Sequence, residues 1–305
     1  MSILLLEQAL NGLQLGLMLF LLAAGLTLVF GIMDMVNLAH GSLYMVGAYL
    51  IASITSASGS FWLGLGGGVV ATAALGMLLE ITVLRRLYQR DHVTQVLGTF
   101  AILLMANEGV RMVWGSQAVS LNPPAALAGP VELLPGFYYP AFRLLIIGVG
   151  LATALLLYLL VTRTRMGMQV RAGASNREMA LAMGTPVTGL FTTVFGLGAA
   201  LCALAGGMLG PLLAVQVGMG ESILILAFVV IVIGGIGSIR GALVGALLVG
   251  LVDSGGRTLL PMLFDALLGP QAAADAAPAV ASILIYLLMA TVLAFKPRGL
   301  FPAHG

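Results

Sequence analysis

Charged residues are scarce in this chain. Asp, Glu, Lys and Arg make up 8% of the 305 residues, hydrophobic residues make up 60%, and the formal net charge is +2. So small a positive charge excludes the basic surface that nucleic-acid binding requires. The apolar runs are long, and these hold no charged residue at all: 9–32, 61–79, 144–162 and 276–295.

Cysteine and lysine occur once each. Cys202, in an apolar run, excludes a disulfide within the chain and a cluster of thiolate metal ligands. Lys296 lies in KPRG, so no Walker A loop, which needs GxxxxGK[ST], is present. The three histidines, His40, His92 and His304, lie in unrelated contexts, and there is no HExxH motif. Because no nucleophile and base can be paired, we expect neither an enzyme nor a metal site.

The apolar runs have the length of membrane-spanning helices, which need about 20 mainly apolar residues. They are continuous, whereas the strands of a membrane barrel alternate. No polar stretch is long enough to fold alone, and the longest, residues 114–141, reads as a loop with at most a short helix. We therefore predict an all-α, polytopic integral membrane protein that forms one domain over residues 1–305. The first residues, MSILLLEQALNG, lack a basic region, so we expect no cleaved signal peptide.

Basic residues indicate the topology. Ten of the 13 Lys and Arg residues fall in segments 85–90, 163–177 and 296–298 and at Arg240. The positive-inside rule places these segments in the cytoplasm, with the loops near 114–141, 214–222 and 257–278 outside. The N-terminus is then outside and the C-terminus inside. The predicted spans are 9–32, 35–57, 61–84, 93–113, 142–162, 187–213, 222–236, 241–256 and 278–295.

This count has a range of about eight to ten, because some of the spans could be broken or re-entrant helices. The second span carries Asn37 and His40, and the seventh and eighth are short.

Polar residues cluster in one apolar segment, GIMDMVNLAHGSLYMVGAY, residues 31–49. Ionisable residues at membrane depth usually face a bundle interior or an aqueous cavity, since lipid exposure costs about 2.5–3.5 kcal/mol or more. Two interpretations stay open. The cluster is either structural, as a polar contact between helices or an interfacial turn, or it lines a substrate path. The candidate path residues are Asp34, Asn37, His40, Gly41, Ser42 and Tyr44.

The segment ASNREMALAMGTP, residues 174–186, has the pattern of a short capped helix. Ser175 and Glu178 match a capping box, and Gly184 and Pro186 match a C-terminal stop. A helix over 176–183 would be roughly 12 Å long, too short to span a membrane. Its apolar side fits either docking to a partner protein or a position on lipid headgroups.

Glycines dominate VIGGIGSIRGALVGALLVG, residues 232–250, on both sides of a short basic loop. This composition predicts a tight re-entry or a hinge, with Gly234, Gly235, Gly237 and Ser238 as candidate hinge or gate residues. The spacings Gly12–Gly16 and Gly241–Gly245 favour close helix packing.

Together these segments resemble the permease subunit of branched-chain amino acid ABC importers, of the LivH type. The matching stretches are GLTLVFGIMDMVNLAHGSLYMVGAY, TRMGMQVRAGASNREMALAMGTP, GGIGSIRGALVGALLVG and KPRGLF. In ABC permeases a cytoplasmic EAAxxxG loop carries force from the ATPase. Glu178, Ala180 and Gly184 occupy that pattern here, with Met179 in place of its first Ala. The resemblance implies a coupling loop near 163–186, with contact residues Ser175, Arg177, Glu178, Met179, Ala180, Met183 and Gly184.

The resemblance also implies a transport function and partners. The chain would move branched-chain or related amino acids across the bacterial inner membrane, together with a second permease, two ATPase subunits and an external solute-binding protein. No cofactor is expected in this chain, because ATP and Mg would be bound by the ATPase subunits.

Two other functions remain as alternatives. The family includes permeases for urea and short amides. A self-sufficient secondary transporter or channel would need paired intramembrane carboxylates for a coupling ion, and only Asp34 and Asp253 are candidates. An intramembrane enzyme has no motif to support it.

Overall fold

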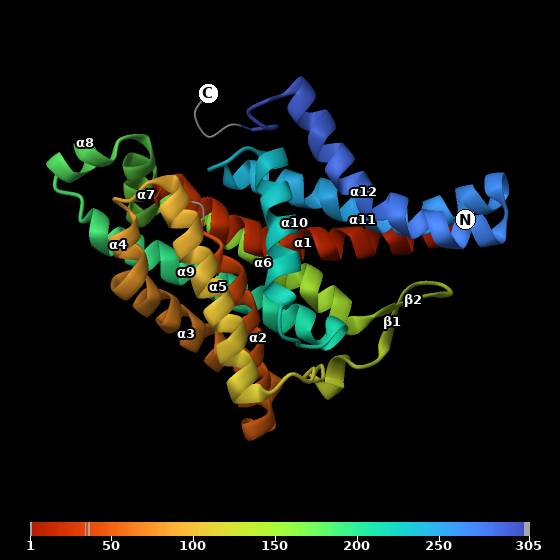
Figure 1. Ribbon diagram of the computed structural model, residues 1–305. Coiled ribbons are helices and arrows are strands. Elements are labelled where there is room, and N and C mark those ends of the chain that lie inside the picture. The colour runs from red at the N-terminus through yellow and green to blue at the C-terminus, as the bar shows by residue number, and fades with distance from the viewer. Residues whose placement is uncertain (1, 34, 36, 302–305) are drawn as a thin grey trace. The chain divides into compact units, whose positions relative to one another are not determined.

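A computed structural model of the protein describes residues 2–33, 35 and 37–301. Helices make up most of it (Figure 1). The elements are α1 (Ser2–Met33), α2 (Ala39–Ser58), α3 (Phe61–Leu79), the π-helix η1 (Glu80–Leu84), α4 (Arg85–Leu87), α5 (His92–Trp114), the 3-10 helix η2 (Ala125–Leu127), β1 (Pro130–Leu134), β2 (Phe137–Pro140), α6 (Ala141–Arg163), α7 (Arg165–Ser175), α8 (Arg177–Ala182), α9 (Val187–Leu213), α10 (Met219–Gly234), α11 (Ile239–Leu268) and α12 (Pro270–Phe295).

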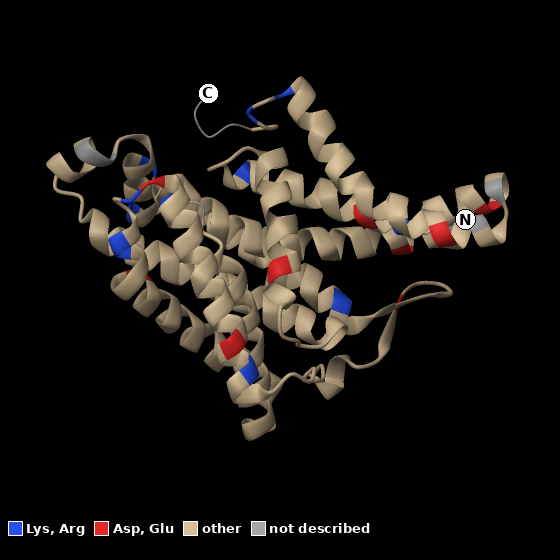
Figure 2. Cartoon of the chain, in the orientation of Figure 1, with Lys and Arg blue, Asp and Glu red and all other residues tan. Residues whose placement is uncertain are grey.

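The long helices have the composition of membrane spans. Within the described residues, seven helical segments are long and apolar enough to cross a membrane: α1, α3 continued through α4, α5, α6, α9, α11 and α12. Charged residues are sparse along them (Figure 2). Helix α10 is apolar but has 16 residues, and α2 has 20 residues but carries polar side chains. The predicted polytopic all-α fold is confirmed, and each predicted span overlaps one helix in the predicted order.

The chain divides into two compact units. One comprises residues 21–125 and 152–226, and we call it the α2–α9 unit; the other comprises residues 1–20, 126–151 and 227–305, and we call it the α11–α12 unit. In the α2–α9 unit, α2 packs against α3, α5 and α9, and α3 also packs against α9 (Figure 1). In the α11–α12 unit, α11 packs against α12, and β1 pairs antiparallel with β2.

Glycines allow the close helix packing that their spacing predicts. In the α11–α12 unit, a Cβ atom on Gly16 would lie 2.8 Å from the carbonyl oxygen of Ala246, and one on Gly250 would lie 2.3 Å from that of Gly12. Real Cβ atoms do not approach so closely, so α1 and α11 meet backbone to backbone at these positions. Small residues are what permits such an approach between membrane helices.

The segment 114–141 holds more structure than the predicted loop with at most a short helix. It contains η2 and a hairpin in which Pro130 pairs with Pro140 and Val131 with Tyr139. Gly136 takes the left-handed conformation, with φ 80°, at the turn. Prolines are tolerated here because they lie at the open end of the hairpin, where few ladder hydrogen bonds are needed.

The predicted outer loop over 257–278 is wrong. Helix α11 continues to Leu268, α12 begins at Pro270, and Gly269 with φ 84° separates them. Pro261 lies inside α11, as membrane helices allow. Pro270 stands at the start of α12, where a missing N–H costs nothing, and the alanines that follow it are the strongest helix formers.

Candidate functional site

The polar segment begins with a turn held by Asn37. Its side-chain oxygen accepts a hydrogen bond from the Ala39 N–H at 3.0 Å, and its carbonyl accepts one from the His40 N–H at 3.4 Å. Asn37 is fully buried, and its amide nitrogen has no hydrogen-bond partner among the described residues. Asn37 therefore directs the chain into α2. Asp34, which was predicted alongside it, lies outside the described residues.

His40 joins three helices of the α2–α9 unit. Its Nε2 atom lies 3.2 Å from the carbonyl oxygen of Leu22 in α1 and 3.0 Å from the sulfur of Cys202 in α9. The Cys202 sulfur also lies 3.5 Å from the His40 carbonyl, to which its S–H can donate. With the proton assigned to Nε2, the imidazole donates to Leu22 and the thiol to the His40 carbonyl. His40 is fully buried, so it fastens α2 between α1 and α9.

Gly41 lies against the first turn of α10. A Cβ atom on Gly41 would lie 2.5 Å from the Gly220 carbonyl oxygen, and one on Gly220 would lie 2.2 Å from the Gly41 carbonyl oxygen. The backbones of α2 and α10 therefore approach closely at Gly41. A larger residue there would displace the start of α10.

Ser42 and Tyr44 complete the polar segment, and both are buried. The Ser42 hydroxyl has no hydrogen-bond partner among the described residues. The Tyr44 backbone lies against Gly206 of α9, since a Cβ atom on Gly206 would lie 2.7 Å from the Tyr44 carbonyl oxygen. The described polar residues thus lie together inside the α2–α9 unit, and a place on a substrate path stays a prediction.

The short helix predicted over 176–183 is present as α8 (Arg177–Ala182), and a second short helix, α7 (Arg165–Ser175), precedes it in the coupling segment. Asn176, not Ser175, is the N-cap of α8: its backbone is extended (φ −155°, ψ 103°), and its side chain accepts a hydrogen bond from the Met179 N–H at 2.9 Å. Ser175 is the last residue of α7, so its backbone is helical and it cannot serve as the N-cap of α8. Helix α8 covers Arg177–Ala182, and the structure does not describe the side chains of Arg177 and Glu178.

The end of α8 matches the sequence prediction. Gly184 takes the left-handed conformation with φ 83°, and the Thr185 N–H donates to the Ala180 carbonyl at 3.0 Å. Pro186 then precedes the first residue of α9. Ala180 faces inward, whereas Met179 and Met183 are 60% and 80% exposed. Two flexible apolar side chains are therefore exposed, one on α8 and one at its C-terminal cap.

The glycine-rich segment forms a braced turn in the α11–α12 unit. Gly235 and Gly237 have φ 106° and 81°, and the Ser238 hydroxyl caps α11 by accepting the Gly241 N–H at 3.1 Å. The N–H groups of Leu300 and Phe301 donate to the carbonyls of Ile233 and Gly234, each at 2.9 Å. The C-terminal segment thus holds the turn. The hinge or gate role of Gly234, Gly235, Gly237 and Ser238 stays a prediction.

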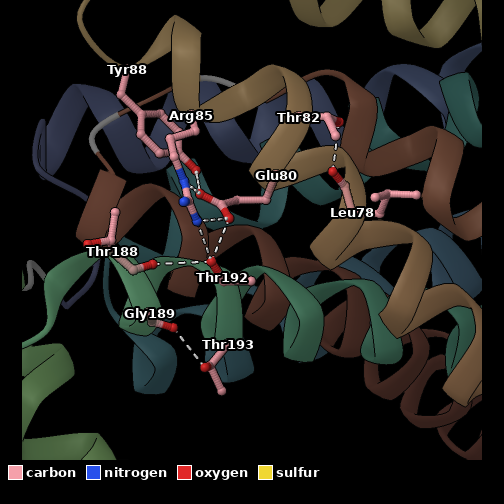
Figure 3. A network of polar contacts seen from close by, with 9 residues as sticks. All are labelled: Leu78, Glu80, Thr82, Arg85, Tyr88, Thr188, Gly189, Thr192 and Thr193. Atoms are coloured by element: carbon pink, nitrogen blue, oxygen red, sulfur yellow. Dashed lines mark hydrogen bonds and ion pairs between the residues drawn. The ribbon is translucent and has the colours of Figure 1, made fainter.

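A buried carboxylate that the sequence reading did not single out lies in η1. Glu80 is fully buried in the α2–α9 unit and accepts hydrogen bonds from Arg85, Tyr88 and Thr192 (Figure 3). The available signal was one acidic residue inside an apolar span, five positions before an arginine. Its partner Thr192 could not be found this way, because it lies 112 positions along the chain.

A cavity of about 390 Å³ lies between the C-terminal end of α2 and residues 120–125, also in the α2–α9 unit. Its polar lining comes from Thr55, Ser56, Ser120 and Asn122. None of the predicted site residues that the structure describes is among its lining residues.

The three predicted site segments fall within one family match. The sequence profile of the family described as branched-chain amino acid transport system / permease component matches residues 8–293. The chain belongs to this family. Family membership covers the polar segment, the coupling segment and the glycine-rich turn together.

Individual permeases of the family are similar to the chain over most of its length. It is 28% identical to the high-affinity branched-chain amino acid transport system permease protein BraD of Pseudomonas aeruginosa, covering 97% of this chain and 95% of BraD. It is 30% identical to the high-affinity branched-chain amino acid transport system permease protein LivH of Escherichia coli K12, covering 82% of this chain and 85% of LivH. The L-arabinose ABC transporter permease protein AraH of Azospirillum brasilense is 25% identical over 75% of this chain and 71% of AraH. No solved structure matches the chain.

As a member of this permease family, the chain is a transport protein by relationship, and its relatives are permeases rather than enzymes. The relatives' names assign no residue, so the path, coupling and hinge roles stay predictions.

Proposed function

We propose that the chain is the membrane-spanning subunit of an ATP-driven importer that carries branched-chain amino acids across the bacterial inner membrane. The family match over residues 8–293, with two relatives that transport these amino acids by name, supports this proposal. The positive segments would face the cytoplasm, with the N-terminus outside and the C-terminus inside.

The proposal that ATP drives the transport is supported by the exposed surface of α8. Met179 and Met183 stand exposed between Asn176, whose backbone is extended, and Gly184, whose backbone is left-handed. Flexible methionines adapt to the groove of a partner protein. Because the chain's one lysine is Lys296 in KPRG, ATP and Mg would be bound by separate ATPase subunits that dock on α8.

The remaining partners would be a second permease and an external solute-binding protein, which together with the ATPase pair complete the importer. The substrate path would run past the polar segment. Because Asn37, His40 and Tyr44 are buried, the path must open in another state of the complex. Cysteine at position 37, 40 or 44, in a Cys202→Ala background, should react with a water-soluble thiol reagent in the ATP-trapped complex. Inertness of all three positions in every state would assign these residues to packing.

The experiment that tests the function is purification of the tagged chain from native membranes, followed by reconstitution in proteoliposomes. We expect ATPase subunits to co-purify and L-leucine uptake to require ATP. Uptake driven by an ion gradient without ATP, with no ATPase present, would contradict the proposal and favour a secondary transporter. Urea and L-arabinose in the same assay distinguish a permease for a different substrate.

A matched pair of variants tests the docking surface. Asn176→Ala removes the observed cap of α8, a loss that costs about 0.5–2 kcal/mol in other helices. It should weaken co-purification of the ATPase, while Ser60→Ala, which removes the side-chain cap of α3, should leave it unchanged. Equal behaviour of the two variants would argue against docking on α8.

A further inference from the structure

The carboxylate of Glu80 is satisfied by groups from two separate parts of the chain. The Arg85 guanidinium donates through Nη2 to Oε2 at 3.1 Å, and the Tyr88 hydroxyl donates to Oε1 at 3.0 Å. The Thr192 hydroxyl, from α9, donates to Oε2 at 2.6 Å (Figure 3). Arg85 also donates to the Thr192 oxygen at 2.9 Å, so the groups form one closed network.

Thr192 differs from two other threonines near it. Thr193 and Thr82 each donate to the carbonyl four residues earlier in their own helices, at 2.8 and 2.7 Å. Thr192 lies 3.2 Å from the corresponding Thr188 carbonyl but only 2.6 Å from the Glu80 carboxylate. A hydroxyl has one proton, and a charged acceptor at the shorter distance takes it. Thr192 therefore bonds to another helix where its neighbours bond within their own.

The backbone at Glu80 is also unusual. Residues Glu80–Leu84 form a π-helix, and the Arg85 N–H donates to the Glu80 carbonyl, so backbone and side chain of Arg85 both hold Glu80. Single π-helical turns inside α-helices occur frequently at functional sites. Here the turn places the carboxylate and its arginine side by side, facing α9.

The position of Thr192 connects this network to α8. Helix α9 begins at Val187, directly after the Gly184 turn that ends α8. The Phe191 ring meets the Tyr88 ring edge to face, with centroids 5.5 Å apart. About 15 Å further along α9, at a rise of 1.5 Å per residue, Cys202 contacts His40. One helix thus joins α8, the Glu80 network and the polar segment.

We propose that Glu80, Arg85, Tyr88 and Thr192 are positioning residues that lock the first turns of α9 to η1 and α4. A displacement of α8 then moves α9 together with the end of α3, and the link through Thr185 and Pro186 does not absorb it. Through this network, the movement that ATP hydrolysis produces at α8 reaches the polar segment. This inference rests on the proposed function of the chain.

The test measures L-leucine transported per ATP hydrolysed in proteoliposomes that hold the complex purified from native membranes. Thr192→Val keeps the shape of the side chain and removes the hydroxyl. We expect it to lower this ratio at least about fivefold, the lower end of usual coupling between sites, while ATP hydrolysis continues. Thr193→Val is the matched control and should leave the ratio unchanged. Thr192→Ser, which keeps the hydroxyl, should restore it.

The outcomes separate this inference from the proposed function. If Thr192→Val lowers uptake and hydrolysis equally, or changes neither, the network is merely structural and the inference fails. If Thr192→Val does not assemble, Tyr88→Phe decides in its place, because it removes one hydroxyl and keeps the ring against Phe191. A wild-type complex with no ATP-dependent uptake would instead overturn the proposed function.

Discussion

His40 and Glu80 are both fully buried polar residues of the α2–α9 unit, yet their surroundings differ. His40 contacts one carbonyl and one thiol, and its Nδ1 atom has no hydrogen-bond partner among the described residues. Glu80 accepts hydrogen bonds from Arg85, Tyr88 and Thr192. A neutral imidazole can leave one ring nitrogen unpaired at modest cost, whereas a buried carboxylate needs a counter-ion and full hydrogen bonding.

This difference has a consequence for folding and function. The His40 site depends on shape, because glycines surround it: a Cβ atom on Gly25 would lie 3.0 Å from the His40 ring. The Glu80 site depends on charge and on contacts made far apart in sequence. The two sites should therefore respond differently to substitution, and the following predictions order them by expected effect on thermal stability.

The largest effect is expected from Arg85→Met, which leaves the buried Glu80 carboxylate without its counter-ion. We expect the melting temperature of the detergent-solubilised protein to fall by roughly 5 °C or more. Arg86→Met is the matched control, because the Arg86 side chain is exposed. Equal melting temperatures for the two variants would mean that water, not Arg85, satisfies the carboxylate.

A smaller effect is expected from His40→Leu. The variant keeps an apolar body of similar size but removes the additional hydrogen bond from the imidazole to the Leu22 carbonyl, which leaves that oxygen with only its bond within α1. We therefore expect a fall of roughly 3–5 °C. The exposed His92 supplies the control, His92→Leu. If His40→Leu proves at least as destabilising as Arg85→Met, the contrast between a neutral and a charged buried site is wrong.

Cys202→Ala should matter less. Buried cysteine behaves mainly as a small hydrophobe, and the Leu22 carbonyl keeps its donor from His40. We expect a fall of roughly 2 °C or less, measured in the same melting experiment. The double variant His40→Leu with Cys202→Ala should melt at most about 2 °C below His40→Leu alone. A larger difference would show that the thiol and the imidazole act as a coupled pair.

The smallest effect is expected at an exposed carboxylate, Asp91, which caps α5. It accepts hydrogen bonds from the Thr94 hydroxyl at 2.6 Å and the Thr94 N–H at 3.1 Å, and these lower its pKa. Its stabilisation is therefore present above the unfolded pKa of about 4 and is lost as the pH falls through the lower folded value. Asp91→Ala should melt roughly 1–2 °C below wild type at pH 7, and the gap should close at low pH. Asp91→Asn, an equally good cap, should show no such pH dependence.

The structural features that the sequence predicts correctly are those determined by residues close together in the chain. Uncharged runs located the long helices, Gly184 and Pro186 marked the end of α8, and the Gly12–Gly16 spacing marked a helix contact. Each depends on local composition or on a residue's own backbone preference.

Contacts between residues far apart in the sequence could not be predicted from local composition. Thr192 lies 112 positions from Glu80, and Cys202 lies 162 from His40. Local context also misled the cap of α8. Ser175 fits the capping pattern, but α7 continues through it, so the extended backbone that a cap requires falls on Asn176 instead.

The bracing of the glycine-rich turn constrains how the protein is assembled in the membrane. The carbonyls of Ile233 and Gly234 receive their donors from Leu300 and Phe301, which follow two further helices in the chain. During synthesis the turn is therefore made long before its partners exist. It can reach its final form only after α11 and α12 have been synthesised. We therefore expect the turn to close late in biogenesis and its closure to complete the α11–α12 unit.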